Sequence, residues 1–121
     1  MANFVDFVAS INLFACECHQ RSRADGWWNT QELSNIGTKL CLIHSEISEA
    51  MEGYRRDLMD DHLPNRKMVE VELADAMIRI GDLAAALNLD LGGAIAAKME
   101  YNANRADHKL IVRNTLHGKR F

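Results

Sequence analysis

The chain has 121 residues, with 14 Lys and Arg against 17 Asp and Glu, so its formal net charge is −3. This length fits a single domain, and a composition that is 48% hydrophobic and 26% charged excludes the disordered and fibrous classes. The slight excess of acids argues against binding to a nucleic-acid polymer, which needs a basic face. No apolar run approaches the roughly 20 residues of a membrane span, so we expect no membrane partner.

The cysteines and the opening residues indicate a cellular compartment. An odd number of cysteines, Cys16, Cys18 and Cys41, favours reduced thiols over a disulfide framework. The opening residues carry no basic segment, so no secretory signal is expected. Together these features predict a cytoplasmic protein.

Apolar side chains recur at three- and four-residue steps in four segments that are rich in helix-forming residues. We expect the first helix at about residues 3–21, the second at 30–57, the third at 65–87 and the fourth at 90–108. Thr30 and Asp90 are candidate N-caps of the second and fourth helices, and Asn88 is expected to end the third. The stripe predicted to face the core in the first helix includes Phe14 or Ala15, and Cys18. The corresponding stripes are Ile36, Leu40, Ile43, Ile47, Met51, Tyr54 and Leu58 in the second helix and Val69, Leu73, Met77, Ile80, Ala84 and Leu87 in the third.

Four helices with short connections predict an all-α fold, an antiparallel four-helix bundle that spans residues 1–108 as one domain. Residues 109–121, which include Arg113, His117, Lys119 and Arg120, are expected to form a basic C-terminal tail. A second helix of roughly 28 residues, or about 42 Å, is longer than a compact bundle of this mass needs. Part of its stripe is therefore expected to be buried by another copy of the chain, in a homodimer or tetramer.

Two helices carry acidic pairs in matching positions. Glu46 and Glu49 lie three residues apart on the second helix, and Glu72 and Asp75 do so on the third. Residues at this spacing share one helix face. A helical wheel places each pair beside the apolar stripe of its helix, and on the same side of the stripe in both helices. Two packed helices could therefore bring all four carboxylates to one edge of the core. A solvated acidic face is the alternative, because a single pair of this kind is common on exposed helices.

A cation site is the chemistry that such a set of acids favours. Four carboxylates in one cleft repel each other unless a cation lies between them, and Mg²⁺ prefers oxygen ligands. A di-iron site of the four-helix type needs Glu-x-x-His, and none of the five histidines has a glutamate three residues before it. The set therefore favours Mg²⁺, or Mn²⁺, over iron.

The fourth helix carries the opposite charge. Lys98, Asn102 and Arg105 are spaced by four and three residues and share one face. Such a face can bind phosphate oxygens, because arginine can donate two parallel hydrogen bonds and lysine supplies a compact positive charge. The alternative is an exposed basic helix end that complements the helix dipole.

Five further residues are weaker candidates for substrate contacts. Trp27 and Trp28 lie in a loop, where exposed indoles could stack on a nucleobase or else seal the core. Asn12 and His44 could recognise a base or a sugar, and Lys39 could contact a phosphate group. Packed or solvated side chains are the alternatives for these three residues.

The combined pattern resembles the MazG-like, all-α nucleoside triphosphate pyrophosphatases. The resemblance rests on HSEISEA at residues 44–50, VELADA at 71–76 and KMEYNANR at 98–105, and it covers about residues 36–108. It implies an α-helical fold that assembles as dimers or pairs of dimers and cleaves nucleoside triphosphates between the α and β phosphates. It further implies that Mg²⁺ is held by Glu46, Glu49, Glu72 and Asp75, and that the nucleotide is contacted by Lys98, Asn102 and Arg105.

From these features we expect a Mg²⁺-dependent hydrolase that converts a nucleoside or deoxynucleoside triphosphate to the monophosphate and pyrophosphate, as a house-cleaning enzyme of the nucleotide pool. The metal would neutralise the triphosphate and activate a water for attack at the α-phosphorus. Glu49, with Glu46 beside it, is the candidate for orienting or deprotonating that water. A related dUTP or phosphoribosyl-ATP pyrophosphatase is one alternative, and a non-catalytic helical interaction module is another.

Overall fold

The computed structural model describes residues 4–105 and 109–118. Its helices are α1 (Phe4–Ala24), α2 (Ile36–Arg55), α3 (Met68–Ala86), α4 (Leu91–Asn104) and the short α5 (Leu110–Arg113). Over these residues the structure has no strand, and one isolated bridge joins Met59 to Lys67 in the connection between α2 and α3. The prediction of an all-α fold is therefore confirmed.

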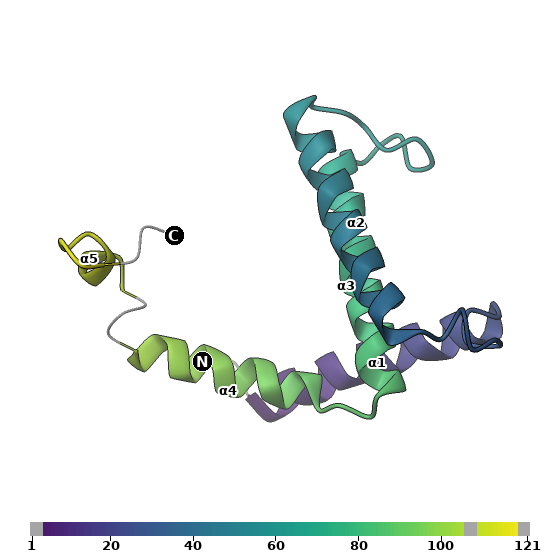
Figure 1. The fold of residues 1–121 in the computed structure, drawn as a ribbon, viewed down its shortest axis with the longest axis horizontal. Helices are drawn as coiled ribbons and strands as arrows, with labels where there is room; N and C mark the ends of the chain where they lie inside the picture. Colours follow the sequence, from purple (N-terminus) through teal and green to yellow (C-terminus); the bar gives the residue numbers. More distant parts are fainter. Residues whose placement is uncertain (1–3, 106–108, 119–121) are drawn as a thin grey trace.

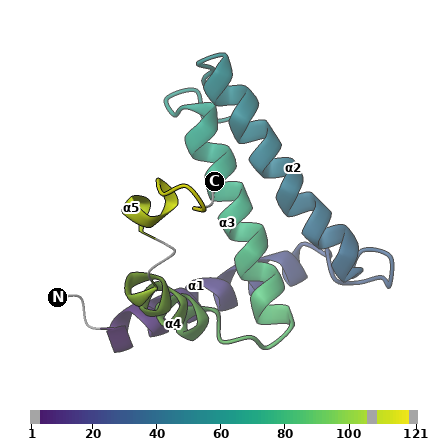
Figure 2. The ribbon, with the colours of Figure 1, turned by 60° about the vertical axis from the view of Figure 1, so that its left-hand side comes forward.

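Helix α1 links the two halves of the molecule. Figures 1 and 2 show α2 and α3 side by side, with α1 crossing them and α4 lying along another part of α1. The helices α3 and α4 are bent by 113° relative to each other at the short break between them. Because α1 packs on both α3 and α4, it fixes how the α2–α3 pair sits relative to α4.

The start of α2 differs from the prediction. Asn35, and not Thr30, caps the helix, because Asn35 Oδ1 accepts a hydrogen bond from Thr38 N at 2.9 Å. Thr30 Oγ1 instead accepts from Leu33 N at 3.1 Å in a separate turn. The predicted start at residue 30 is thus wrong, and α2 has 20 residues. Its length therefore gives no reason to expect a second copy of the chain.

The connection between α3 and α4 has the predicted helix end and the predicted N-cap. Asn88 has a φ of 55°, the left-handed conformation that stops a helix just after its last turn. Asp90 caps α4, since its side chain accepts a hydrogen bond from Gly93 N at 2.9 Å. The other end of α4 was predicted near residue 108, but the helix ends at Asn104, because the next residue is extended.

Part of the predicted helix end and of the predicted basic tail falls outside the described residues. These parts are residues 106–108 and the tail residues Lys119 and Arg120. Within the tail, the structure describes α5 and the turn that follows it, including Arg113 and His117.

Of the apolar stripes predicted for α2 and α3, only Ala84 is among the buried residues of the pair. The buried residues of α2 are Glu46, Ala50 and Gly53, and those of α3 include Glu72 and Ala76. The predicted core residues that are instead exposed are Leu40, Ile47, Met51, Tyr54, Leu73, Met77 and Leu87. Small residues explain the difference, because they let the two helices approach closely. A Cβ atom added at Gly53 would lie only 2.7 Å from the side chain that faces it on α3.

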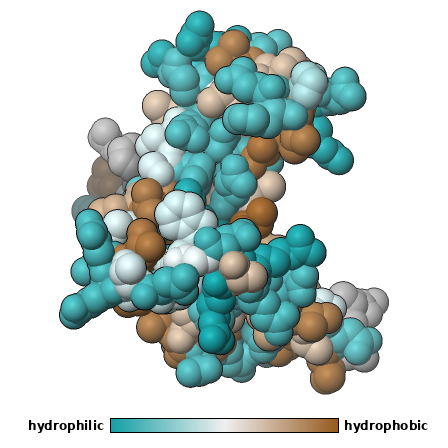
Figure 3. Space-filling view, turned by 90° about the vertical axis from the view of Figure 1, so that its right-hand side faces the viewer, coloured by the Kyte–Doolittle hydropathy of each residue, from teal (hydrophilic) through white to brown (hydrophobic). Residues whose placement is uncertain are grey.

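The single chain leaves much apolar surface in solvent. Its accessible surface is 9395 Å², whereas a folded monomer of this mass typically has ~6,600 Å². No large apolar side chain among the described residues is fully buried. Figure 3 shows apolar side chains, in brown, among hydrophilic ones on one face of the molecule. Helices α2 and α3 thus present their apolar stripes to solvent.

Among the described residues, no single helix is long and apolar enough to cross a membrane. The bent pair of α3 and α4 passes that test by length and composition when the two helices are taken together.

Gly92 lets the start of α4 lie directly against α1. A Cβ atom there would lie 2.4 Å from Val8 O and 2.9 Å from Val8 Cα, both of which are backbone atoms. We therefore expect Gly92→Ala to push α4 away from α1 and to lower the free energy of unfolding by about 1–3 kcal/mol. Urea or thermal denaturation measures this loss.

Gly37→Ala is the matched control for that substitution. Its added Cβ would meet only the side chain of Asn35, at 3.3 Å. We expect a much smaller change in stability, and an equal loss in the two variants would contradict the proposed role of Gly92.

Candidate functional site

Three carboxylates from two helices meet at the α2–α3 interface. Oxygens of Glu46 on α2 and of Glu72 and Asp75 on α3 all lie within 4.8 Å of one another. Glu46 and Glu72 are buried because they lie on the faces where small residues bring the helices together. Asp75 follows Glu72 by three residues and so shares its helix face. The structure therefore brings together three of the four acids that the sequence singles out.

The environment of Glu72 shows how strongly these acids interact. Burial raises the pKa of Glu72 from its ordinary 4.5 to about 7, and hydrogen bonding and charge from Glu46 and Glu49 add to the shift. The exposed Glu49 therefore lies close to the cluster, although it is not one of the three. Burial and the charge of Glu46 also raise the pKa of Asp75, while Arg79 opposes that rise. Burial, reinforced by the neighbouring carboxylates, thus favours protonation of Glu72 near neutral pH.

Arg79 supplies a counter-charge. Its Nε donates a hydrogen bond to Glu46 Oε1 at 2.7 Å across the two helices, and 43% of its side chain is exposed. It follows Asp75 by about one turn and so lies on the same face of α3. A guanidinium that is held by one carboxylate and partly open to solvent can also bind a phosphate group. Arg79 was not among the predicted site residues, although its spacing from Asp75 is a signal that could have identified it.

The donor set fits Mg²⁺ or Mn²⁺. All the ligand atoms are carboxylate oxygens, which hard divalent cations prefer, and three of them lie close enough to share one ion. Burial is the main cause of the raised pKa of Glu72, and the charges of Glu49 and Glu46 add to it; a divalent cation would offset those like charges.

A cavity of about 960 Å³ opens beside the acids, where α1, α2 and α3 meet. This volume lies in the range of small-molecule sites, about 300–1,000 Å³. Asp75, Ile78, Arg79 and Asp82 recur at helical spacing, so one face of α3 forms a wall, and Glu46 joins it from α2. The facing walls belong to α1, the following loop and α2, and they include Phe14, Arg21, Trp27, Leu33, Lys39 and Leu42.

Trp28 has its polar edge bound inside the protein. Its Nε1 donates to Asp82 Oδ1 at 2.9 Å, and His19 Nδ1 lies 2.8 Å from the same oxygen. The His19 ring meets the indole edge-on, and Lys39 Nζ lies 4.1 Å from the centroid of the Trp28 ring. Trp28 thus ties the loop after α1 to both α1 and α3.

His19 and Asp82 were not predicted as site residues. Asp82 lies seven residues after Asp75, and that spacing was the signal for a shared face. No short-range pattern links His19 to Asp82, because 63 residues separate them in the chain.

The weaker candidates are distributed over the molecule. Trp27 and Lys39 line the cavity. Asn12 lies at the junction of α1 and α4, where its side chain binds the N-terminal turn of α4. His44 is exposed on α2 and does not line the cavity.

The predicted phosphate-binding face lies apart from the acids in the single chain. Lys98, Asn102 and Arg105 belong to α4, which runs away from the α2–α3 pair (Figure 1), and none of them lines the cavity. The charged groups of Lys98 and Arg105 lie 4.7 and 5.6 Å from the ring centroid of Tyr101. Asn102 Oδ1 is buried and has no hydrogen-bond partner among the described residues.

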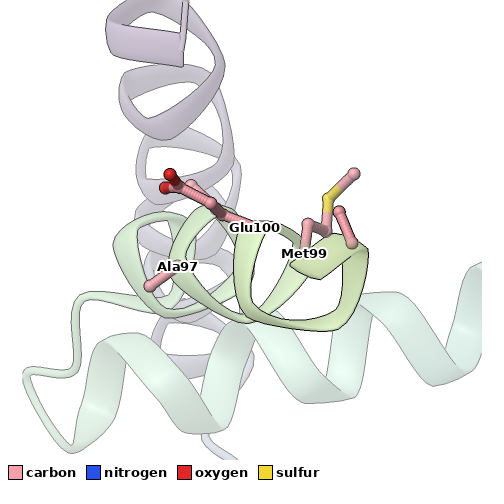
Figure 4. A pocket seen from close by; sticks show the side chains of 5 residues that line it. Ala97, Met99 and Glu100 are labelled. Atoms are coloured by element: carbon pink, nitrogen blue, oxygen red, sulfur yellow. The ribbon is translucent and has the colours of Figure 1, made fainter. Parts of the chain in front are cut away.

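A second hollow, of about 760 Å³, lies on α4 itself (Figure 4). Its lining residues are Ala96, Ala97, Met99, Glu100 and Ala103. All five belong to one helix, so no other described element of the chain forms an opposite wall.

The raised pKa of Glu72 predicts that the stability of the metal-free protein depends on pH. The carboxyl titrates at about 7 in the folded chain and at its ordinary 4.5 in the unfolded chain, so the folded state binds the proton more tightly. The resulting stabilisation is complete below pH 4.5 and is lost as the pH rises through about 7. In EDTA, we expect the Tm to fall between about pH 5.5 and about pH 8.

Glu72→Gln removes the titrating group, so it should remove most of that fall in Tm. Glu70→Gln, on an exposed part of the same helix, is the matched control and should preserve it. A pH dependence that persists unchanged in Glu72→Gln would contradict the assignment.

Comparison with known proteins identifies no relative. No protein-family model, curated protein or solved structure matches the chain. The function must therefore be inferred from the geometry and chemistry of the site itself.

Proposed function

We propose that this protein is a Mg²⁺-dependent nucleoside triphosphate pyrophosphohydrolase, which releases a monophosphate and pyrophosphate. The observation that carries the proposal is the cluster of Glu46, Glu72 and Asp75 beside a cavity large enough for a nucleotide. Carboxylates that hold Mg²⁺ next to an open site bind phosphate groups through that ion. The resemblance to MazG-like pyrophosphatases supports the same activity.

The two ends of a nucleotide would use different walls of the cavity. The cationic side chain of Arg79 lines it together with Glu46 and Asp75, and these three residues suit a metal-bound triphosphate. The aromatic and aliphatic walls suit the base and sugar, because ligand sites combine apolar surfaces with a few polar groups.

The roles of the individual residues follow from this placement. Glu46, Glu72 and Asp75 would hold Mg²⁺, which when bound neutralises charge on the triphosphate and lowers the pKa of a water molecule. Glu49 lies beside Glu72 but outside that triad, so its exposed carboxylate would accept the proton of the attacking water. Arg79 would donate hydrogen bonds to phosphate oxygens and stabilise the departing pyrophosphate.

We further propose that the protein is a homo-oligomer, a dimer or a pair of dimers, in which helices of two copies complete an antiparallel bundle. The exposed apolar stripes of α2 and α3 support this proposal. The accessible surface also exceeds the typical value for this mass by roughly 2,800 Å². If each of two copies buried this excess, the interface would total about 5,600 Å², which is at the upper end of obligate interfaces, about 2,000–5,000 Å² or more.

A second copy would also bring the basic face of α4 to the acids. Lys98, Asn102 and Arg105 do not line the cavity of their own chain. We propose that this face contacts the triphosphate in the cavity of a neighbouring copy. The open hollow on α4 is consistent with a neighbour that packs against this helix.

Hydrolysis of a panel of nucleoside triphosphates, with dUTP and phosphoribosyl-ATP included, tests the activity. We expect Mg²⁺-dependent formation of monophosphate and pyrophosphate, resolved by anion-exchange chromatography. Glu46→Gln and Asp75→Asn should each lower kcat/KM at least about 100-fold, since even outer-shell partners of a metal are worth ~10–100-fold.

Glu70→Gln is the matched control, because Glu70 lies on the exposed side of α3 and pairs with Arg66. It should leave kcat/KM unchanged. Release of orthophosphate, or activity that survives both ligand substitutions, would contradict the mechanism. Absence of both turnover and Mg²⁺ binding would favour a non-catalytic helical interaction module.

Mixed oligomers test whether α4 completes the site of another copy. Glu46→Gln and Lys98→Ala chains should each be weakly active alone. In a random one-to-one mixture of dimers, roughly a quarter of the sites would combine intact acids from one chain with Lys98 from the other. The activity of the mixture should therefore rise to about a quarter of the wild-type activity. A monomer by light scattering, or no recovery in a verified heterodimer, would overturn the proposed assembly.

A further inference from the structure

Asp82 is a buried carboxylate that the proposed metal chemistry does not use. It lies on α3 about 10.5 Å along the helix axis from Asp75 and lines the same cavity. Its Oδ1 accepts a hydrogen bond from Trp28 Nε1 at 2.9 Å and lies 2.8 Å from His19 Nδ1. Because an ionised carboxylate only accepts hydrogen bonds, Nδ1 of His19 carries the proton in this contact.

The second oxygen of Asp82 is available to a ligand. No hydrogen bond from the described residues reaches Oδ2, and 13% of the side chain is exposed. The two donors on Oδ1 hold the carboxylate in one orientation. Trp28 is itself held by its contacts with His19 and Lys39. Oδ2 is therefore an acceptor at a fixed position on a residue that lines the cavity.

We propose that Asp82 determines base specificity, with Oδ2 accepting a hydrogen bond from the exocyclic amino group of a nucleobase such as cytosine or adenine. This inference rests on the proposed function, because it requires a nucleotide whose triphosphate lies at the acids. The spacing between Asp75 and Asp82 suits a nucleoside that extends along α3 from the phosphates to the base edge. Phe14 and Trp27 line the cavity and offer aromatic faces for the base.

A carboxylate distinguishes amino bases from keto bases for an electrostatic reason. N4 of cytosine and N6 of adenine each donate hydrogens, whereas O4 of uracil and thymine is an acceptor. A keto oxygen opposite Oδ2 would place two acceptors together with no hydrogen between them. Where the base excludes water from Oδ2, that contact leaves both groups unpaired, which is unfavourable. The site should therefore prefer cytosine and adenine to uracil and thymine.

The first test changes the substrate and leaves the protein as it is. With wild-type protein and Mg²⁺, kcat/KM for dCTP should exceed that for dUTP by about tenfold or more. The 2-pyrimidinone deoxynucleoside triphosphate, which is the cytosine nucleotide without its amino group, should lose a similar factor. Equal values for the three substrates would overturn the proposal.

The second test changes the acceptor. In Asp82→Asn the amide oxygen can keep the bonds from Trp28 and His19, while the amide nitrogen donates to a keto oxygen. We expect the ratio of kcat/KM for dCTP to that for dUTP to fall by about tenfold. Asp25→Asn is the matched control, because Asp25 lines the same cavity and loses the same charge. An unchanged ratio in Asp82→Asn, or an equal change in Asp25→Asn, would overturn the proposal.

Binding of nucleosides separates a failure of this inference from a failure of the proposed function. Cytidine and uridine carry no phosphate, and saturation-transfer NMR measures their binding without any hydrolysis. Tighter binding of cytidine that is lost in Asp82→Asn, with no pyrophosphate released from any triphosphate, would support Asp82 and overturn the pyrophosphatase. Release of pyrophosphate with equal binding of the two nucleosides would overturn the role of Asp82 alone.

Discussion

Repulsion between Glu46, Glu72 and Asp75 opposes the close packing of α2 against α3. Small residues such as Gly53 nevertheless bring the helices together, and the acids are carried into the interface with them. The ion pair between Arg79 and Glu46 offsets part of the repulsion, while burial, with the hydrogen bonds and charges of Glu46 and Glu49, raises the pKa of Glu72. Two helices packed in this way are suited to a divalent cation, because a cation would stabilise both the interface and the charged form of its acids.

The same packing decides where the apolar surface goes. Because α2 and α3 meet through small and acidic residues, side chains such as Ile47, Met51 and Met77 remain on the outside of the pair. Burying them requires a partner, and no residue of the basic face of α4 lines the cavity of its own chain. The proposed oligomer therefore accounts for two features together, the exposed stripes and the separation of basic from acidic residues.

Much of the local structure could be predicted from the sequence, and the limits of prediction have physical causes. The left-handed Asn88, the Asp90 cap and the shared face of Glu72 and Asp75 depend on residues within one or two turns. The start of α2 was predicted wrongly because two adjacent turns each contain a plausible capping residue. Ala15, Cys18 and Ala84 are buried as predicted. Most of the buried face between α2 and α3 was predicted wrongly, because a helical wheel weighs hydrophobicity and ignores how closely small residues let helices approach.

By itself, the sequence determined the helical class, the caps between α3 and α4, and the spacing that puts acids on one helix face, since these features are set by near neighbours in the chain. Only the tertiary structure decided that Arg79 pairs with Glu46 and that Trp28 meets Asp82, which lie 33 and 54 residues apart. Such contacts depend on the distance and orientation between helices. These quantities arise from the packing of all the helices together, and the residue pattern of any one helix does not contain them.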